Sequence, residues 1–179
     1  MSNIEFLSKL LNYGHEIKSV LIDTSFLIRL LKKENDLYQN AQDYFKYFRE
    51  NKIDVYLSSI VIGEYCVKDK IESIPLKFFK QISFDLRDAK FSGIFTGILL
   101  KDKDLRENTE RILIKEDCKL ISQVYTRNID AYITKDVSSL NKIIKPIQAV
   151  YTDFIFEFID LNMPLSSFLN MLPLEIPKK

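Results

Sequence analysis

The chain of 179 residues contains a single histidine, two cysteines and four glycines, and each scarcity argues against a class of chemistry. With His15 alone, neither a serine–histidine or cysteine–histidine relay nor a zinc site of the His/Cys kind is indicated. The few glycines form no GxGxxG or GxxxxGK motif, so the chain lacks a glycine-rich cradle for a nucleotide. Cys66 and Cys118 are far apart in sequence, and we expect reduced thiols rather than a disulfide.

Long apolar runs and a strong charge of one sign are also missing. No stretch reaches the ~18 apolar residues needed to cross a bilayer, and the N-terminal residues do not resemble a secretory signal. We therefore expect a cytoplasmic protein with no membrane partner. The formal net charge is +1, so no overall basic field indicates nucleic-acid binding. A metal-loaded acidic cleft would supply positive charge locally. The remaining candidates for catalysis are carboxylates.

Strand-like and helix-like segments alternate along the chain. Apolar, β-branched segments at 20–23, 53–59 and 131–134 are typical of buried strands, and 147–152 of an edge strand. Helices are predicted over 3–13, 26–33, 36–50, 86–101, 137–144 and 154–161, over a segment carrying Glu64, and from about 117 to 125. This alternation predicts an α/β fold with three layers, α/β/α, around a central parallel sheet of about four to five strands.

The helix starts and the domain limits follow from the same pattern. Thr24 or Ser25 is expected to cap the helix over 26–33, and Ser58 or Ser59 the helix that carries Glu64. We expect one domain over 18–160, a leading helix within 1–17 and an amphipathic tail over 161–179. The tail is predicted to pack on its own domain, with a dimer or partner contact as the alternative.

Asp23 ends the apolar part of VLIDTSFLI (residues 20–28) and is followed by two hydroxyl side chains. A carboxylate at the mouth of a buried strand is costly unless a helix N-terminus, a hydrogen-bond network or a metal ion compensates it. Glu64 follows LSSIVIG and Asp136 follows AYITK. Ligand sites in parallel sheets gather beyond the carboxyl ends of the strands, so these three acids are predicted to share one edge.

The pattern leaves alternatives for these acids. Asp117 lies inside a helical stretch, and spacing alone does not orient it. Each of the four acids is equally compatible with a helix cap or an ion pair. Asp85, after FFKQISF, is interpreted as the cap of the helix that begins with Leu86.

The order VLIDTSFLI, LSSIVIGEY, an acid at a helix start and AYITKD resembles the PIN domain family, which includes the VapC-type toxins of bacterial toxin–antitoxin pairs. The family has an Asp ending the first strand, a Glu on the helix after the second, an Asp opening a later helix and a Thr-x-Asp soon after. The matching positions in this chain are Asp23, Glu64, Asp117 and Asp136, accompanied by the hydroxyl residues Thr24, Ser25 and Thr134. The resemblance covers roughly residues 18–160.

The resemblance implies a metal-dependent nuclease that hydrolyses RNA. Carboxylate oxygens select Mg²⁺ or Mn²⁺ over softer metals. Asp23 and Asp117 would be direct or water-bridged ligands, Glu64 would ligate or orient the attacking water, and Asp136 would complete the site. The hydroxyls of Thr24, Ser25 and Thr134 would fix the carboxylate rotamers. Lysines near the motifs, each also compatible with a solvated surface role, are candidates for phosphate contacts: Lys32, Lys33, Lys68, Lys70 and Lys135.

The chain departs from the family pattern in two places. The segment KEDCKLISQVYT is polar where relatives carry small apolar residues, so Glu116 is an alternative to Asp117. Val137, Ser138 and Ser139 follow Asp136, where many relatives have a further acid. A second metal ion would therefore be held by fewer carboxylates.

Expected partners are an RNA substrate, an antitoxin protein if the chain is a toxin, and a second copy in a homodimer. A haloacid-dehalogenase-like phosphatase needs an acid two residues after Asp23, where this chain has Ser25, and a receiver domain fits no better. The rival outside the enzymes is a PIN-like module that binds RNA or protein without cutting.

Overall fold

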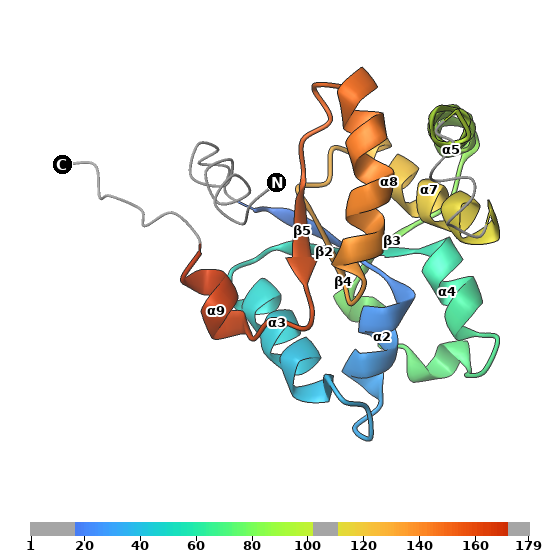
Figure 1. Ribbon diagram of the computed structural model, residues 1–179. Coiled ribbons are helices and arrows are strands. Elements are labelled where there is room, and N and C mark those ends of the chain that lie inside the picture. Colours follow the sequence, from blue (N-terminus) through green and yellow to red (C-terminus); the bar gives the residue numbers. More distant parts are fainter. Residues whose placement is uncertain (1–16, 102–110, 172–179) are drawn as a thin grey trace.

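Five short segments form one parallel sheet, with the most apolar strand at its centre. The computed structural model describes residues 17–101 and 111–171, so the expected leading helix over 3–13 lies outside the described residues. The strands are β1 (Ser19–Ile22), β2 (Asp54–Ser58), β3 (Lys80–Ile82), β4 (Ala131–Thr134) and β5 (Glu157–Asp160). They are ordered β3-β2-β1-β4-β5, and all neighbours run parallel (Figure 1). The expected α/β class with a central parallel sheet is confirmed.

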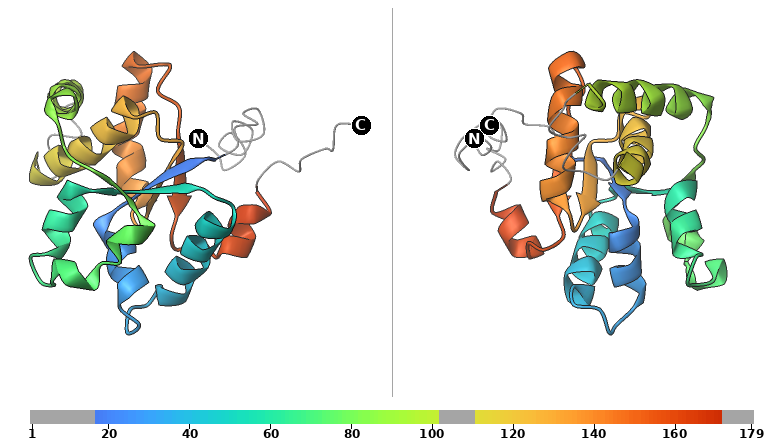
Figure 2. Two further views of the ribbon diagram at one scale, coloured as in Figure 1. Left: turned by 180° about the vertical axis from the view of Figure 1, so that it is seen from behind. Right: turned by 45° about the vertical axis from the view of Figure 1, so that its right-hand side comes forward.

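Helices cover both faces of this sheet. They are α2 (Thr24–Leu31), α3 (Tyr38–Glu50), α4 (Ser59–Tyr65), α5 (Leu86–Leu99), α7 (Arg111–Thr126), α8 (Val137–Val150) and α9 (Leu165–Leu169). The chain moves outward from β1 to β3 and then crosses back to β4 and β5. Right-handed crossovers therefore put α2, α3 and α4 on one face and α5, α7 and α8 on the other. The packing of α2 on α3 and α4, and of α5 on α7 and α8, agrees (Figure 2).

The core lies between the central strands and these two helical layers. Leu21, Leu57 and Ile133 from three neighbouring strands are fully buried, as are Phe26 on α2 and Phe95 on α5. Cys66 is exposed and Cys118 is buried, and both are free thiols, as expected. In the described part of the chain, no helix is long and apolar enough to cross a membrane.

The structure corrects the prediction for the stretch from 147 to 161. Residues 147–150, expected at the start of an edge strand, form the last turn of α8, which continues past Pro146 because Ile143, Ile144 and Ile147 face the core. Residues 154–161, expected as a helix, contain β5, whose residues pair with β4. Both segments are apolar and aromatic, and the partner strand, rather than the local pattern, decides between helix and strand.

Two smaller differences concern α2 and β3. Asp23 itself caps α2, which begins at Thr24, so neither Thr24 nor Ser25 is the cap. The three-residue strand β3 was not predicted, because it is short and its residues are largely exposed. The other two cap predictions are confirmed: Ser58 caps α4, and Asp85 caps α5.

The described part of the C-terminal tail packs on its own domain, as predicted. The ring of Phe168 on α9 is 5.8 Å from that of Tyr44 on α3, and the side chain is almost completely buried. The Tyr44 hydroxyl donates a hydrogen bond to the carbonyl of Met163 at the entry to α9. Leu169, the next residue, is 36% exposed.

Phe168 and Leu169 therefore form a matched pair for testing this contact. We expect Phe168→Ala to lower the free energy of unfolding by about 2–3 kcal/mol, because it removes a buried ring at the edge of the core. Leu169→Ala is expected to cost less than about 1 kcal/mol. Urea denaturation of both variants measures the difference, and equal costs would contradict the packing of α9 on α3.

Candidate active site

Asp23 lies where β1 ends and α2 begins, at the carboxyl edge of the sheet. Its carboxylate accepts hydrogen bonds from the backbone N–H of Phe26 at 2.7 Å, from Ser25 Oγ at 2.8 and 2.9 Å, and from Thr134 Oγ1 at 2.7 Å. Burial nevertheless raises the pKa of Asp23, although these donors and the charge of Arg29 act to lower it. Two of the three predicted hydroxyl residues thus hold this carboxylate.

The third hydroxyl residue, Thr24, is hydrogen-bonded to Glu64. Ser58 caps α4 directly after β2, and Glu64 lies in the last turns of that helix, exposed to solvent. Thr24 Oγ1 donates a hydrogen bond to Glu64 Oε2. Glu64 is therefore linked to the residue that follows Asp23, although forty positions separate Thr24 from Glu64 in the chain.

Asp136 caps α8 just after β4. Its carboxylate accepts hydrogen bonds from the backbone N–H of Ser139 and from Ser138 Oγ, both at 3.1 Å, and its own N–H donates to Thr134 Oγ1 at 3.1 Å. Burial acts to raise the pKa of Asp136, but the hydrogen bonds from Ser139 and Ser138 hold it below its usual value. Thr134 connects Asp136 to Asp23.

Asp117 on α7 lies within electrostatic reach of the other three acids. Its burial raises the pKa of its carboxyl from 3.8 to about 7, and the charges of Asp136, Asp23 and Glu64, in that order, add to the increase. Glu116 is engaged elsewhere, because Lys119 Nζ donates to its two oxygens at 2.7 and 2.8 Å. Of the two alternatives, Asp117 and Glu116, Asp117 is thus the one that lies close to Asp23, Glu64 and Asp136.

A buried polar network fixes the far end of α7. The fully buried carboxylate of Asp88, on α5, accepts hydrogen bonds from Thr126 Oγ1 at 2.5 Å and from Arg127. Arg127 and Gln123 also donate to the carbonyl of Ser83, at 2.9 and 3.2 Å. The polar character of α7, which departed from the family pattern, is therefore explained in part by this anchor. The D-x-x-D spacing of Asp85 and Asp88, which form a capping box, is a sequence signal for it.

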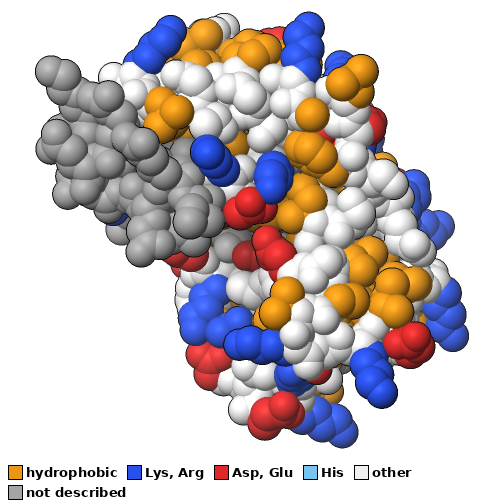
Figure 3. Space-filling view, turned by 90° about the vertical axis from the view of Figure 1, so that its right-hand side faces the viewer, with side chains coloured by type: hydrophobic (Ala, Val, Ile, Leu, Met, Phe, Trp, Pro, Cys, Tyr) orange, Lys and Arg blue, Asp and Glu red, His pale blue; other side chains and the backbone are white. Residues whose placement is uncertain are grey.

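The lysines near the motifs differ in their ion pairs and exposure. Lys32 is paired with Asp69 at 2.7 Å and Lys135 with Asp36 at 3.1 Å, while Lys33, Lys68 and Lys70 are exposed. Figure 3 shows acidic side chains near the middle of one face, with lysine and arginine side chains around them.

Arg29 was not among the predicted residues, although its place one helical turn after Ser25 could have indicated it. Its Nη1 donates to the carbonyl of Ser25 at 3.0 Å, and its charge acts to lower the pKa of Asp23.

The donor types suit a hard divalent cation, because all four residues supply carboxylate oxygens and the charges of three of them raise the pKa of the fourth, Asp117. Within residues 17–101 and 111–171, however, no group of three or more His, Cys, Asp or Glu side chains is arranged as a ready-made metal cluster. The carboxylates of Asp23, Glu64 and Asp136 instead accept hydrogen bonds from hydroxyl side chains.

A scan against models of known protein families and a search of curated proteins find no match for this chain. Among solved structures, the chain is similar to a chain in the crystal structure of VapBC2 from Rickettsia felis bound to a DNA fragment from their promoter. The TM-score is 0.54 and the sequence identity 18%, with 79% of this chain and 99% of that chain covered. The fold is PIN-like. At this identity the similarity establishes the PIN-like arrangement of sheet and helices alone.

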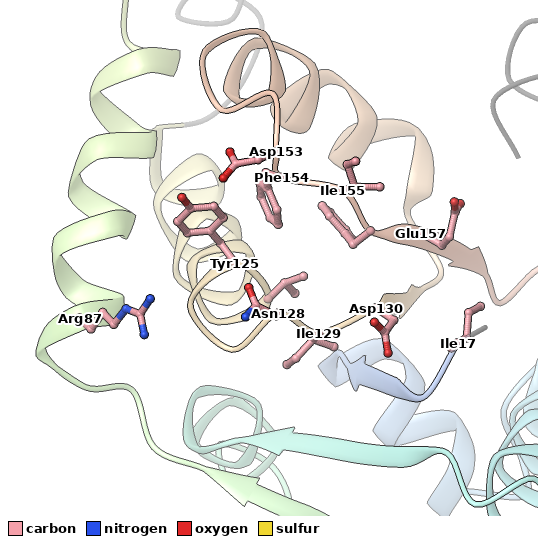
Figure 4. A pocket seen from close by; sticks show the side chains of 12 residues that line it. Ile17, Arg87, Tyr125, Asn128, Ile129, Asp130, Asp153, Phe154, Ile155 and Glu157 are labelled. Atoms are coloured by element: carbon pink, nitrogen blue, oxygen red, sulfur yellow. The ribbon is translucent and has the colours of Figure 1, made fainter. Parts of the chain in front are cut away.

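A concave feature lies at the opposite, amino edge of the PIN-like sheet. A cavity of about 360 Å³ lies between the end of α7 and the segment that enters β5 (Figure 4). Ile17 before β1, Asp130 before β4 and Glu157 at the start of β5 line it. Because these residues precede or begin their strands, the cavity lies across the sheet from Asp23. Burial raises the pKa of Glu157.

The pKa of Asp117 predicts how stability depends on pH. The folded carboxyl titrates near 7 and the unfolded one near 3.8, so its ionisation destabilises the folded state above about pH 7. This cost declines as the pH falls from about 7 to about 4. Without metal, lowering the pH from 8 to 5 should stabilise the wild type relative to Asp117→Asn by about 2 to 3 kcal/mol.

Urea denaturation of both proteins in EDTA at the two pH values measures this change. Asp54→Asn, which removes an acid at the amino edge of the sheet, is the control and should follow the wild type. A constant difference between the wild type and Asp117→Asn would show that Asp117 titrates like an exposed carboxyl.

Proposed function

We propose that this protein is a divalent-metal-dependent endoribonuclease that hydrolyses RNA phosphodiester bonds. The observation that carries the proposal is that four acids from separate elements lie at one edge of a PIN-like sheet. Thr24 and Thr134 link three of them by hydrogen bonds, and their charges raise the pKa of Asp117. Two further facts support it: hydroxyl side chains hold three of these acids, and the similar chain belongs to a VapBC2 structure.

Asp23, Glu64, Asp117 and Asp136 would hold Mg²⁺ or Mn²⁺. A bound ion would lower the pKa of its water and polarise the phosphoryl oxygen. The hydrogen bonds from Ser25 and Thr134 keep Asp23 at the strand end, and Thr24 keeps Glu64 beside it. In the metal-free protein the pKa of Asp117 is about 7, so its carboxyl is partly protonated at neutral pH. Metal binding is therefore expected to release this proton.

We further propose that the protein is the toxin of a toxin–antitoxin pair. The similar chain comes from a VapBC2 complex, which supports an antitoxin protein as the partner of this chain as well. The acidic edge and the cations beside it would then be the surface that the antitoxin covers.

A non-cleaving module that binds RNA or protein is the second candidate. The observation that favours it is that, within residues 17–101 and 111–171, no three His, Cys, Asp or Glu side chains are arranged to hold a metal ion. The two candidates differ in their response to metal: only the nuclease needs these acids to exchange hydroxyl donors for a cation.

Asp23→Asn separates the candidates. Saturating Mn²⁺ should raise the melting temperature of the wild type by about 5 °C or more, as expected at a hundredfold excess over Kd. Asp23→Asn should lose this shift and reduce Mn²⁺-dependent RNA cleavage by at least about 100-fold, since even partners that only orient metal ligands contribute that much. Without metal at pH 8, the variant should be at least as stable as the wild type, because burial disfavours the ionised Asp23 carboxylate.

Thermal unfolding and cleavage of structured RNA, each with and without Mn²⁺, provide the measurements. Asp54→Asn should behave as the wild type in both. Full metal-dependent cleavage by Asp23→Asn, or a wild-type melting temperature that Mn²⁺ does not change, would refute the four-carboxylate site.

A further inference from the structure

The carboxylate of Asp36 bridges two cations beside the candidate active site. Asp36 lies in the turn between α2 and α3, and 60% of its side chain is exposed. One carboxylate oxygen is 3.2 Å from Arg29 Nε, and the other is 3.1 Å from Lys135 Nζ. The two cations come from different elements, so only the folded chain brings them to one anion.

Both cations are connected directly to the surroundings of Asp23. Arg29 Nη1 reaches back along α2 to the carbonyl of Ser25 at 3.0 Å. The backbone N–H of Lys135 donates to Ser25 Oγ at 3.1 Å, and the same hydroxyl donates to Asp23. The position of Asp36 is therefore one where an anion contacts two cations next to the acidic edge.

We propose that Asp36 occupies an anion subsite whose other occupant is a phosphate of a nucleic-acid backbone. A backbone phosphate has two non-bridging oxygens, which can take the place of the two carboxylate oxygens. It would contact Arg29 and Lys135 when Asp36 turns to solvent. The proposal rests on the proposed function, because it assigns the place where the RNA backbone runs beside the four acids.

Exposure distinguishes the ion pairs of Lys32 and of Lys135 and indicates which one opens. Lys32 and Asp69 are 2.7 Å apart, with side chains 31% and 23% exposed. Asp36 and Lys135 are 60% and 39% exposed, and exposed ion pairs contribute little net stability, so this contact can be exchanged at small cost. Arg29 is 15% exposed, so it is the more fixed of the two cations. An approaching polyanion also needs these cations, because the four acids next to them repel it.

Asp36→Asn tests the subsite, with Asp54→Asn as the matched control. Asp54 is also in an exposed ion pair, with Lys80 at 2.5 Å, but it begins β2 at the opposite edge of the sheet. We expect Asp36→Asn to bind a labelled single-stranded RNA in EDTA about 5- to 10-fold more tightly at low salt, since one internal competitor is gone. Asp54→Asn should change the affinity by less than about twofold, because its charge lies far from the subsite.

The salt dependence provides a readout that a purely structural role would not change. In the wild type, phosphate displaces a tethered carboxylate, whereas in Asp36→Asn it displaces mobile anions. The slope of log K against log salt should therefore steepen by about 0.7 or more in Asp36→Asn. If Asp36 only pinned its turn, the variant would lower the melting temperature and leave affinity and slope unchanged.

A double-mutant cycle identifies the cation. Lys135→Gln should weaken RNA binding, and Asp36→Asn should give at most a twofold gain when added to it, because one of the two phosphate contacts is already lost. Additive effects of the two substitutions would place the phosphate elsewhere and overturn the subsite.

Failure of the subsite and failure of the proposed nuclease are distinguishable. Tighter RNA binding by Asp36→Asn with no Mn²⁺-dependent cleavage by the wild type would support the subsite and refute the nuclease. Metal-dependent cleavage by the wild type, with identical RNA affinity and salt slope for Asp36→Asn, would support the nuclease and refute the subsite.

Discussion

The Asp23 carboxylate is the point at which three elements of this fold are joined. It ends β1, caps α2 through the N–H of Phe26, and accepts the hydroxyl of Thr134 at the end of β4. These donors compensate a carboxylate that burial would otherwise penalise strongly. The same bonds align the carboxyl ends of β1 and β4, so the residues that follow both strands meet. The candidate active site is therefore built around a structural cap.

Repulsion between acids at one edge of the sheet destabilises the folded state, and contacts elsewhere in the structure offset this cost. Asp117 is the residue most affected, with its pKa raised to about 7. Asp117 lies near the middle of α7, and the helix is held at its C-terminal end by the buried contacts of Asp88 with Thr126 and Arg127. The electrostatic cost at Asp117 is thus separated by about two helical turns from the residues that anchor α7.

Positive charge near the acids is distributed through internal ion pairs rather than as an open basic patch. Arg29 and Lys135 share Asp36, and Lys32 pairs with Asp69. The chain as a whole has a formal net charge of only +1. Local cations that exchange an internal carboxylate for a phosphate do not require an overall basic surface.

The sequence alone determined the central strands at 20–23 and 131–134, because their apolar, β-branched residues suit no other position. It also placed Asp23 and Thr134 at the strand ends, where a parallel sheet gathers polar side chains. Tertiary structure decided whether 154–161 is helix or strand, because pairing with β4 outweighs the local pattern. It also decided between Asp117 and Glu116, since adjacent helical residues point about 100° apart and only the contacts of α7 orient them.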